Sequence, residues 1–148
     1  MQTTSTQAAL SATLHCLTGC AAGEIIGMVT GMLFGWSNLV TTIVSIALAF
    51  LVGYSLSLLP LLKAGLAPRT AMVLVLGADT LSIFTMEVVD TLIMLLVPGA
   101  LNASLVNPLF WLTLTLALFA AFWAAFPVNR FLLNRGMGHA LVHNYHQG

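Results

Sequence analysis

Long apolar stretches separated by short polar connections run through the whole chain. A helix needs about 20 mostly apolar residues to cross a bilayer, and four stretches meet this requirement. Charged residues make up only 5% of the 148-residue chain, whereas soluble domains average about 25%. The pattern therefore predicts an all-α integral membrane bundle of four transmembrane helices in a single domain, residues 1–148. The spans are expected at 7–34, 39–62, 70–97 and 109–133, followed by a cytoplasmic tail at 134–148.

The distribution of basic residues predicts the orientation in the membrane. Lys63 and Arg69 lie between the second and third spans, and Arg130 and Arg135 lie at the end of the fourth. Basic residues concentrate in cytoplasmic connections, so both termini are expected on the cytoplasmic side. The chain has only four Lys and Arg residues, too few for a nucleic-acid-binding surface. Its N-terminal stretch also lacks the cationic region of a cleaved signal peptide.

The first span carries a row of glycines at four-residue spacing. The row consists of Gly19, Gly23, Gly27, Gly31 and Gly35. Residues four apart form a continuous ridge on a helix, and small residues let membrane helices approach closely. We expect Gly19 to Gly31 to serve helix packing, with the third span as partner. Any unused glycine surface is expected to support a homo-oligomer.

A second ridge, one position along, carries groups that can bind cations. Cys16, Cys20 and Glu24 lie within about 80° of arc on a helix, and His15 precedes them. Thiolate, imidazole and carboxylate groups are ligands of zinc, and the first two also bind copper. His15, Cys16, Cys20 and Glu24 are therefore candidate metal ligands. The alternative for the two cysteines is that they are inert buried residues.

All four acidic residues of the chain lie within predicted spans. They are Glu24, Asp79, Glu87 and Asp90. A carboxylate at mid-membrane costs at least roughly 2.5–3.5 kcal/mol, so these groups must be protonated, hydrated or bound to a cation. In the third span Asp79, Met86, Glu87 and Asp90 share a face of about 140°, which predicts an ion or proton pathway facing the first span. The alternative is that the acids only lock helices together by hydrogen bonds.

The C-terminal tail adds two histidines at helical spacing. His139 and His143 lie four residues apart and would share one face of a helix, where two imidazoles can bind a transition metal. They are candidate metal ligands at the cytoplasmic end, near the start of the first span. The alternative is an interfacial amphipathic helix whose histidines point to water.

Three groups of motifs together resemble one uncharacterised protein family. Residues 15–24 resemble the HCxxGCxxGE opening of small bacterial membrane domains of unknown function, and residues 135–143 resemble their RGxGHxxxH closing motif. Residues 78–82, Met86, Glu87 and Asp90 resemble the middle signature, whereas Met137 stands where similar chains are expected to have lysine. The resemblance covers nearly the whole chain. It implies four spans in a bacterial inner membrane, and it implies no activity.

Four functions remain open at this stage. The first is binding or transport of a metal ion, with zinc or copper as the possible cofactor and a homo-oligomer as the assembly. The second is a proton or monovalent-cation pathway, which needs the acids but not the cysteines. The third is an accessory subunit of a larger membrane complex. An enzyme is least favoured, because a nucleophilic Cys16 would lie about 100° around the helix from His15 as its base.

Overall fold

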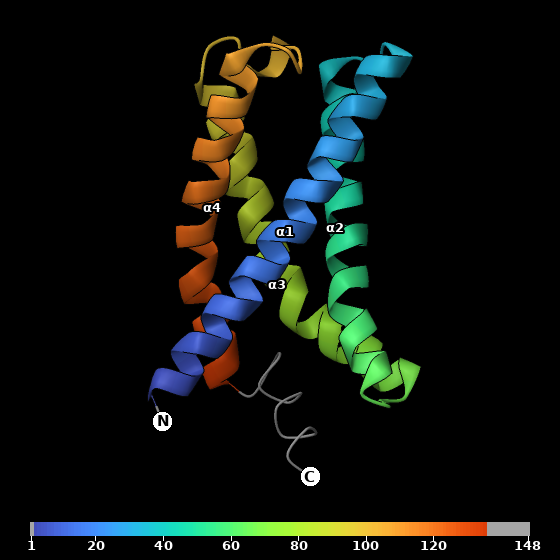
Figure 1. Ribbon diagram of the computed structural model, residues 1–148, viewed down its shortest axis with the longest axis vertical. Coiled ribbons are helices and arrows are strands. Elements are labelled where there is room, and N and C mark those ends of the chain that lie inside the picture. Colours follow the sequence, from blue (N-terminus) through green and yellow to red (C-terminus); the bar gives the residue numbers. More distant parts are fainter. Residues whose placement is uncertain (1, 136–148) are drawn as a thin grey trace.

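The computed structural model of the chain consists mainly of four long helices (Figure 1). It describes the backbone of residues 2–135 and the side chains of residues 6–135. They are α1 (Gln2–Phe34), α2 (Asn38–Lys63), α3 (Pro68–Leu96) and α4 (Pro108–Asn134), and a short 3-10 helix, η1 (Ala100–Asn102), lies between α3 and α4. Each of the four is long and apolar enough to span a membrane. The predicted all-α, four-span membrane protein is therefore confirmed. The largest difference in bounds is at the start of α1, which begins at Gln2 rather than at residue 7.

Local signals in the sequence place the ends of the helices. α1 is followed by Gly35, whose φ of 66° lies in the left-handed region that glycine adopts without strain. α2 begins after Ser37, whose hydroxyl accepts a hydrogen bond from the Val40 amide at 3.4 Å and so caps the helix. Pro68 and Pro108 begin α3 and α4, at the position where a helix does not use the amide proton. Successive helices therefore reverse direction, and the bundle is antiparallel (Figure 1).

The two ends of the bundle differ in charge. One end carries the start of α1, the α2–α3 connection and the end of α4, and the other carries the α1–α2 turn and η1 (Figure 1). We call them the basic end and the η1 end. All the Lys and Arg residues lie towards the basic end: Lys63, Arg69, Arg130 and Arg135. Trp36 and Trp111 lie towards the η1 end with 38% and 45% of their surface exposed, a position typical of aromatic residues at a membrane interface.

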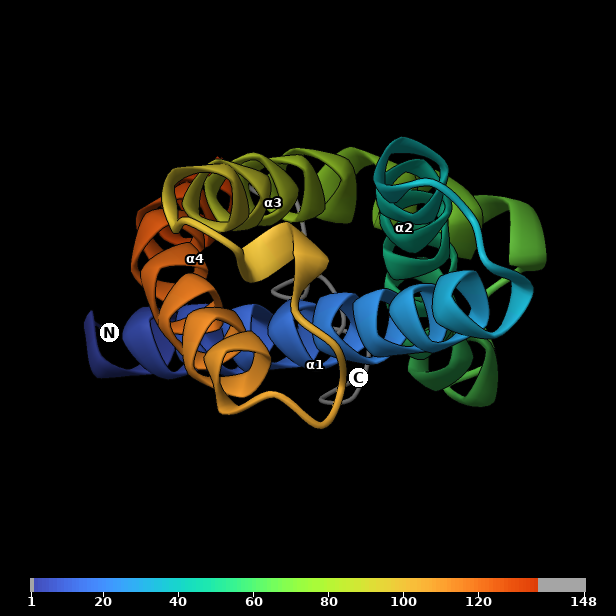
Figure 2. The ribbon, with the colours of Figure 1, turned by 90° about the horizontal axis from the view of Figure 1, so that it is seen from above.

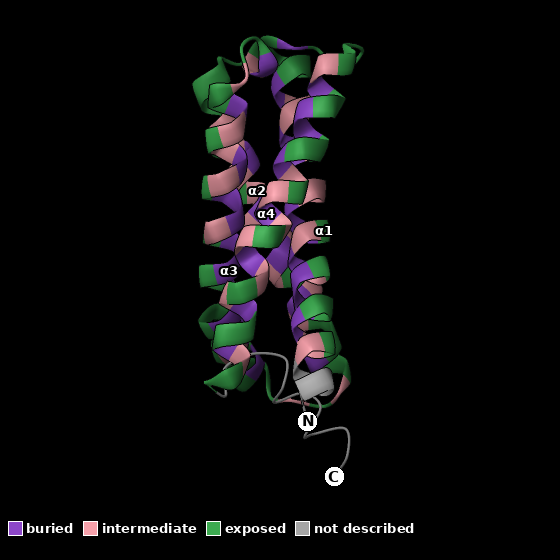
Figure 3. Ribbon diagram, turned by 90° about the vertical axis from the view of Figure 1, so that its left-hand side faces the viewer, coloured by how far each residue is buried: buried purple, intermediate pink, exposed green. Residues whose placement is uncertain are grey.

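The helices form a ring in which each contacts its sequence neighbours and α4 contacts α1 (Figure 2). The α1–α2 contact is the most extensive, and α1 also reaches α3 directly over a much smaller area. Buried residues line the inward faces of the helices, while exposed residues cover the outside (Figure 3). The outward side chains include large apolar groups such as Leu33, Leu112 and Phe119. An apolar outer surface of this kind suits contact with lipid.

The glycine row of α1 packs against α2, so the prediction that it packs against the third span was wrong. A Cβ atom on Gly19 would lie 2.7 Å from the Gly53 Cα atom of α2, closer than two carbon atoms can approach. The next three glycines meet Ala49, Ser45 and Thr41 of α2 in the same way. The physical reason is that α2 presents its own row of small residues at four-residue spacing. Two such rows allow two backbones to approach, whereas α3 offers larger side chains.

This packing also bears on the predicted assembly. Because α2 covers the row from Gly19 to Gly31, that surface is not free to join a second copy of the chain. Among the helical glycines, a Cβ on Gly77 would meet nothing within 4 Å among the described residues. A homo-oligomer therefore remains a prediction, and it would need a surface other than the glycine row.

Candidate functional site

The second ridge of α1 faces the interior and meets the polar face of α3. Cys16, Cys20 and Glu24 are only 1%, 2% and 5% exposed. On α3 the three acids are buried to a similar degree: Asp79, Glu87 and Asp90. Adjacent ridges on a helix point in different directions, so α1 contacts α2 through its glycines and α3 through its thiols and carboxyl. We call these six residues together with Ser82 the acid–thiol seam.

Within the seam, each polar group of α1 has a counterpart on α3. The Glu24 carboxyl lies beside the Asp90 carboxyl. One helical turn towards the basic end, the Cys20 thiol lies beside the Glu87 carboxyl. The next turn brings Cys16 beside the Ser82 hydroxyl and near Asp79. The predicted meeting of this ridge with the acidic face of the third span is therefore seen in the structure.

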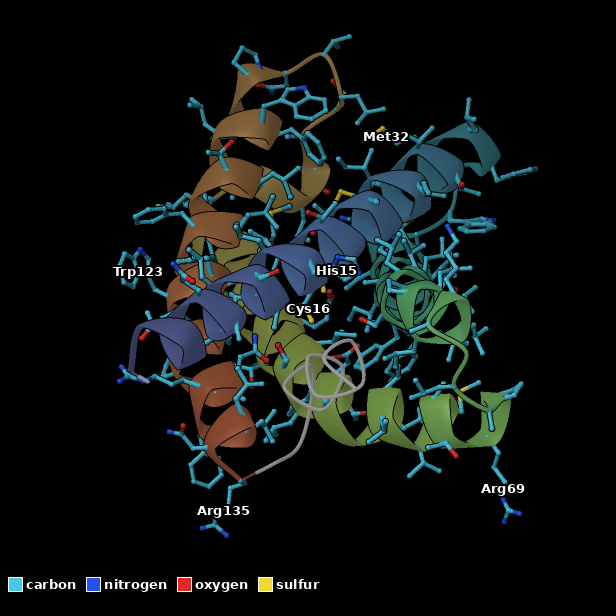
Figure 4. All side chains as sticks on the ribbon, turned by 60° about the horizontal axis from the view of Figure 1, so that its bottom comes forward. His15, Cys16, Met32, Arg69, Trp123 and Arg135 are labelled. Atoms are coloured by element: carbon cyan, nitrogen blue, oxygen red, sulfur yellow. The ribbon has the colours of Figure 1, made fainter. Side chains whose placement is uncertain are left out.

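Basic side chains lie far from this cluster. All four Lys and Arg residues are exposed, and the labelled Arg69 and Arg135 lie at the periphery while Cys16 lies in the middle of the molecule (Figure 4). A buried carboxylate requires a partner of opposite charge or a bound proton. Since no Lys or Arg side chain lies beside Glu24, Glu87 or Asp90, protons or bound cations must neutralise these three acids.

A small cavity adjoins the carboxyl groups at the η1 side of the seam. Its volume is about 20 Å³, and its lining includes Glu24, Glu87, Asp90, Met28, Met94 and Ser45. A site of roughly 10–15 Å³ is enough for one water molecule, so this inner cavity has room for one water or one dehydrated ion. Ser45 Oγ and Asp90 Oδ1 are buried and have no hydrogen-bond partner among the described residues.

A larger cavity of about 180 Å³ lies next to the inner one, between the α1–α2 turn and η1. The two cavities share Met28, Thr42 and Leu101 in their lining. Near the outer cavity, the Asn38 amide of α2 donates a hydrogen bond of 2.7 Å to the Asn102 side chain of η1. The inner cavity therefore adjoins this outer cavity, which lies at the η1 end.

Towards the basic end the seam is closely packed. Met86, which we predicted to lie on the pathway, is 1% exposed and belongs to a core cluster with both cysteines and Ile83. Ile83 is fully buried and is the side chain nearest to a Cβ built on Gly53, at 2.9 Å. Apolar packing therefore surrounds the two thiols, whereas the carboxyl groups adjoin a cavity.

The structure does not bring all the predicted metal ligands together. Within residues 2–135, no three His, Cys, Asp and Glu side chains converge closely enough to hold a metal ion. His15 lies in a shallow depression of α1 with Leu14 and Thr18 and not in the lining of the inner cavity. His139 and His143 lie outside the described residues. Metal binding by these residues stays a prediction.

A second buried polar contact shows how a simple helix lock is built in this chain. The Asn129 amide of α4 donates a hydrogen bond of 2.9 Å to the Thr13 hydroxyl of α1. That hydroxyl in turn donates to the Ala9 carbonyl at 2.7 Å. Each of these two side chains has an uncharged hydrogen-bond partner close by. The inner cavity differs because it gathers three carboxyl groups and leaves polar atoms without a partner in the described part of the chain.

Sequence reasoning missed the contribution of α2 to the site. Ser45 and Thr42 line the inner cavity, although no charged residue marks this stretch. The available signal was the row of small residues Thr41, Ser45, Ala49 and Gly53 at four-residue spacing, which predicts a face suited to close contact with glycine. That face positions α2 beside Glu24 and completes the wall of the cavity.

The comparison with known families agrees with the resemblance noted from the motifs. Residues 5–138 match the family described as a domain of unknown function, DUF4396. Since the match covers nearly the whole chain, the protein belongs to this family. Among curated proteins and solved structures, nothing matches the chain.

Proposed function

We propose that this membrane protein binds a metal cation at the η1 side of the acid–thiol seam and passes it across the bilayer. The observation that carries the proposal is the meeting of Glu24, Glu87 and Asp90 at one buried cavity. Intramembrane carboxyl groups without a basic partner are typical of ion and proton pathways. Three such groups in a chain with four acids in total give the cavity a strong preference for positive charge.

The remaining seam residues extend the donor set towards the basic end. Cys20 adjoins Glu87, and Cys16 lies one turn further along. Thiolates and carboxylates together suit zinc or a similar transition metal. Because the donors stand on two different helices, changes of side-chain rotamer would bring three of them around an ion. His15, His139 and His143 would release or receive the ion near the basic end.

The proposal includes an orientation and a location. The basic end would face the cytoplasm, because all four Lys and Arg residues lie towards it and such residues concentrate on the cytoplasmic side. Both termini would then be cytoplasmic in a bacterial inner membrane. Four spans are few for a carrier, so the working unit would be a homo-oligomer. Reporter fusions to the C-terminus test the orientation, and native mass spectrometry tests the oligomer.

Transport by the purified protein in liposomes tests the function directly. The liposomes carry a metal-sensitive dye, and zinc or reduced copper is added outside. Glu24→Gln and Asp90→Asn should lower the rate at least tenfold, because each removes a charged oxygen donor from the inner cavity. Thr115→Val is the control, since this exposed hydroxyl on α4 donates a hydrogen bond of 2.8 Å to the Trp111 carbonyl of its own helix and does not line the inner cavity. Equal rates in wild type and Glu24→Gln would overturn the proposal.

A proton pathway is the second candidate, and one contact favours it. Two carboxyl groups that lie side by side, as Glu24 and Asp90 do, can exchange a proton when one of them is protonated. A chain of such groups can pass protons along the seam. Liposomes with a pH-sensitive dye separate the two functions: Cys16→Ser with Cys20→Ser should leave proton flux intact but lower metal flux.

A further inference from the structure

The inner cavity holds sulfur atoms as well as carboxyl groups. Met28 of α1 and Met94 of α3 both line it, beside Glu24 and Asp90. Met94 is only 3% exposed, so its thioether is removed from lipid. Thioether sulfur is a soft ligand that selects for soft ions such as Cu(I). The two methionines therefore supply donors where carboxyl groups alone do not form a complete metal site.

The donors of the cavity favour a soft monovalent ion. Glu24, Glu87 and Asp90 line it beside the two methionines, and buried carboxyl groups without a basic partner attract a cation. Carboxyl groups alone accept many cations, whereas thioethers bind soft ones. Cu(I) and Ag(I) are soft ions, and both are monovalent.

Two buried oxygen atoms provide independent evidence for a ligand. Ser45 is 3% exposed and Asp90 is 6% exposed, and both line the inner cavity. Ser45 Oγ and Asp90 Oδ1 have no hydrogen-bond partner among the described residues. A buried polar atom without a partner costs roughly 1–3 kcal/mol. A bound cation would offset that cost for the oxygen atoms of the cavity.

We propose that the inner cavity is a binding site for a soft monovalent cation, Cu(I) or Ag(I), held by the thioethers of Met28 and Met94 and by the oxygens of Glu24 and Asp90. This inference rests on the proposed function and names its substrate class. The volume of about 20 Å³ admits the ion only without its hydration shell. Thioether ligands assist that step because they bind such ions more strongly than water does.

The route to the site follows from the neighbouring cavity. Met28 lines both cavities, and Met32, one turn further along α1, lines the outer one. Met32 is 43% exposed, so its thioether is accessible at the η1 end. Soft donors thus extend from the η1 end to the carboxyl groups, and the ion enters from that side.

The experiment is a titration of the full-length, detergent-purified protein with Ag(I), followed by NMR of ¹³C-labelled methionine methyl groups. The chain has seven methionines, and single Met→Leu variants assign the signals. Leucine conserves the volume of methionine, so Met28→Leu and Met94→Leu should fold. Met72→Leu is the control, because Met72 of α3 is 43% exposed and does not line the inner cavity. Competition with a chromophoric chelator gives the affinity for Cu(I) under reducing conditions, in a Cys16→Ala, Cys20→Ala background.

The inference expects Ag(I) to shift the methyl signals of Met28 and Met94 and to leave that of Met72 unmoved. It also expects Met28→Leu and Met94→Leu each to weaken Cu(I) binding at least tenfold, with no change in Met72→Leu. If Glu24→Gln abolishes Ag(I) binding while both Met→Leu variants bind as wild type does, the thioether inference is overturned and the proposed function stands. If the wild-type protein binds no Cu(I), Ag(I) or zinc, both are overturned.

Discussion

Replacing Gly23 by alanine tests the packing that holds α1 in position. The new Cβ would lie 2.5 Å from the Ala49 Cα atom and 2.5 Å from the Leu48 carbonyl carbon of α2. These are backbone atoms, so no change of rotamer can relieve the contact. The two helices must separate, and Glu24, the next residue along α1, moves with them.

The magnitude follows from two opposing terms. Alanine is favoured over glycine within a helix by about 1 kcal/mol. Overpacking a tight contact costs about 1–3 kcal/mol, and a clash with backbone lies at the upper end of that range. The net destabilisation of Gly23→Ala is therefore about 1–2 kcal/mol. Gly77→Ala is the matched control, because its Cβ would meet nothing within 4 Å among the described residues, and it should stabilise the protein by up to about 1 kcal/mol.

Unfolding in mixed micelles, followed by helical circular dichroism, measures both variants against wild type. The two chemically identical substitutions should change the free energy of unfolding with opposite signs. If Gly23→Ala stabilises the protein as much as Gly77→Ala does, α1 and α2 do not pack through the glycine row, and the position of Glu24 would have to be revised.

Three other substitutions test separate parts of the structure. Asn129→Leu removes the hydrogen bond to Thr13 and should lower the free energy of unfolding by about 0.6 kcal/mol, the average for such bonds between membrane helices; an unchanged stability would contradict this contact. Ile83→Ala should lower the free energy of unfolding by about 2 kcal/mol, which thermal unfolding would measure. This is the lower end of the cost for a buried aliphatic residue, because lipid is itself apolar. Asn38→Ala removes an exposed hydrogen bond to Asn102 and should change stability by less than about 0.5 kcal/mol, while a larger loss would show that η1 is held mainly by this contact.

The membrane fold could be predicted from the sequence because a single requirement dominates it. Every helix needs an apolar length that spans the bilayer, and the polar connections between such lengths are short. The helix ends followed from local signals, such as Gly35 after α1 and Pro68 at the start of α3. The first span was predicted at 7–34, close to the apolar segment Thr6–Phe34, and the polar residues 2–6 extend the same helix beyond it.

The polar part of the site was partly predictable. The acids of the third span were expected to face the first span because acids at mid-membrane must face the interior, and the structure places Asp90 beside Glu24. The partner of the glycine row was wrongly predicted as the third span, since packing depends on the shape of both helices and the matching row of α2 carries no charge. His15 was grouped with Cys16 by its place in the sequence, but neighbouring residues on a helix point about 100° apart, and His15 lies away from the inner cavity.

The proposed function requires that the buried carboxyl groups of the seam bind a metal cation. Elemental analysis of the detergent-purified protein, beside Glu24→Gln and the control Thr115→Val, measures this binding. A transition metal close to one per chain is expected in wild type and in Thr115→Val, and it should be lost in Glu24→Gln. Wild-type protein that holds no metal after loading with zinc or Cu(I) under reducing conditions would contradict the account, and so would a Glu24→Gln variant with an unchanged metal content.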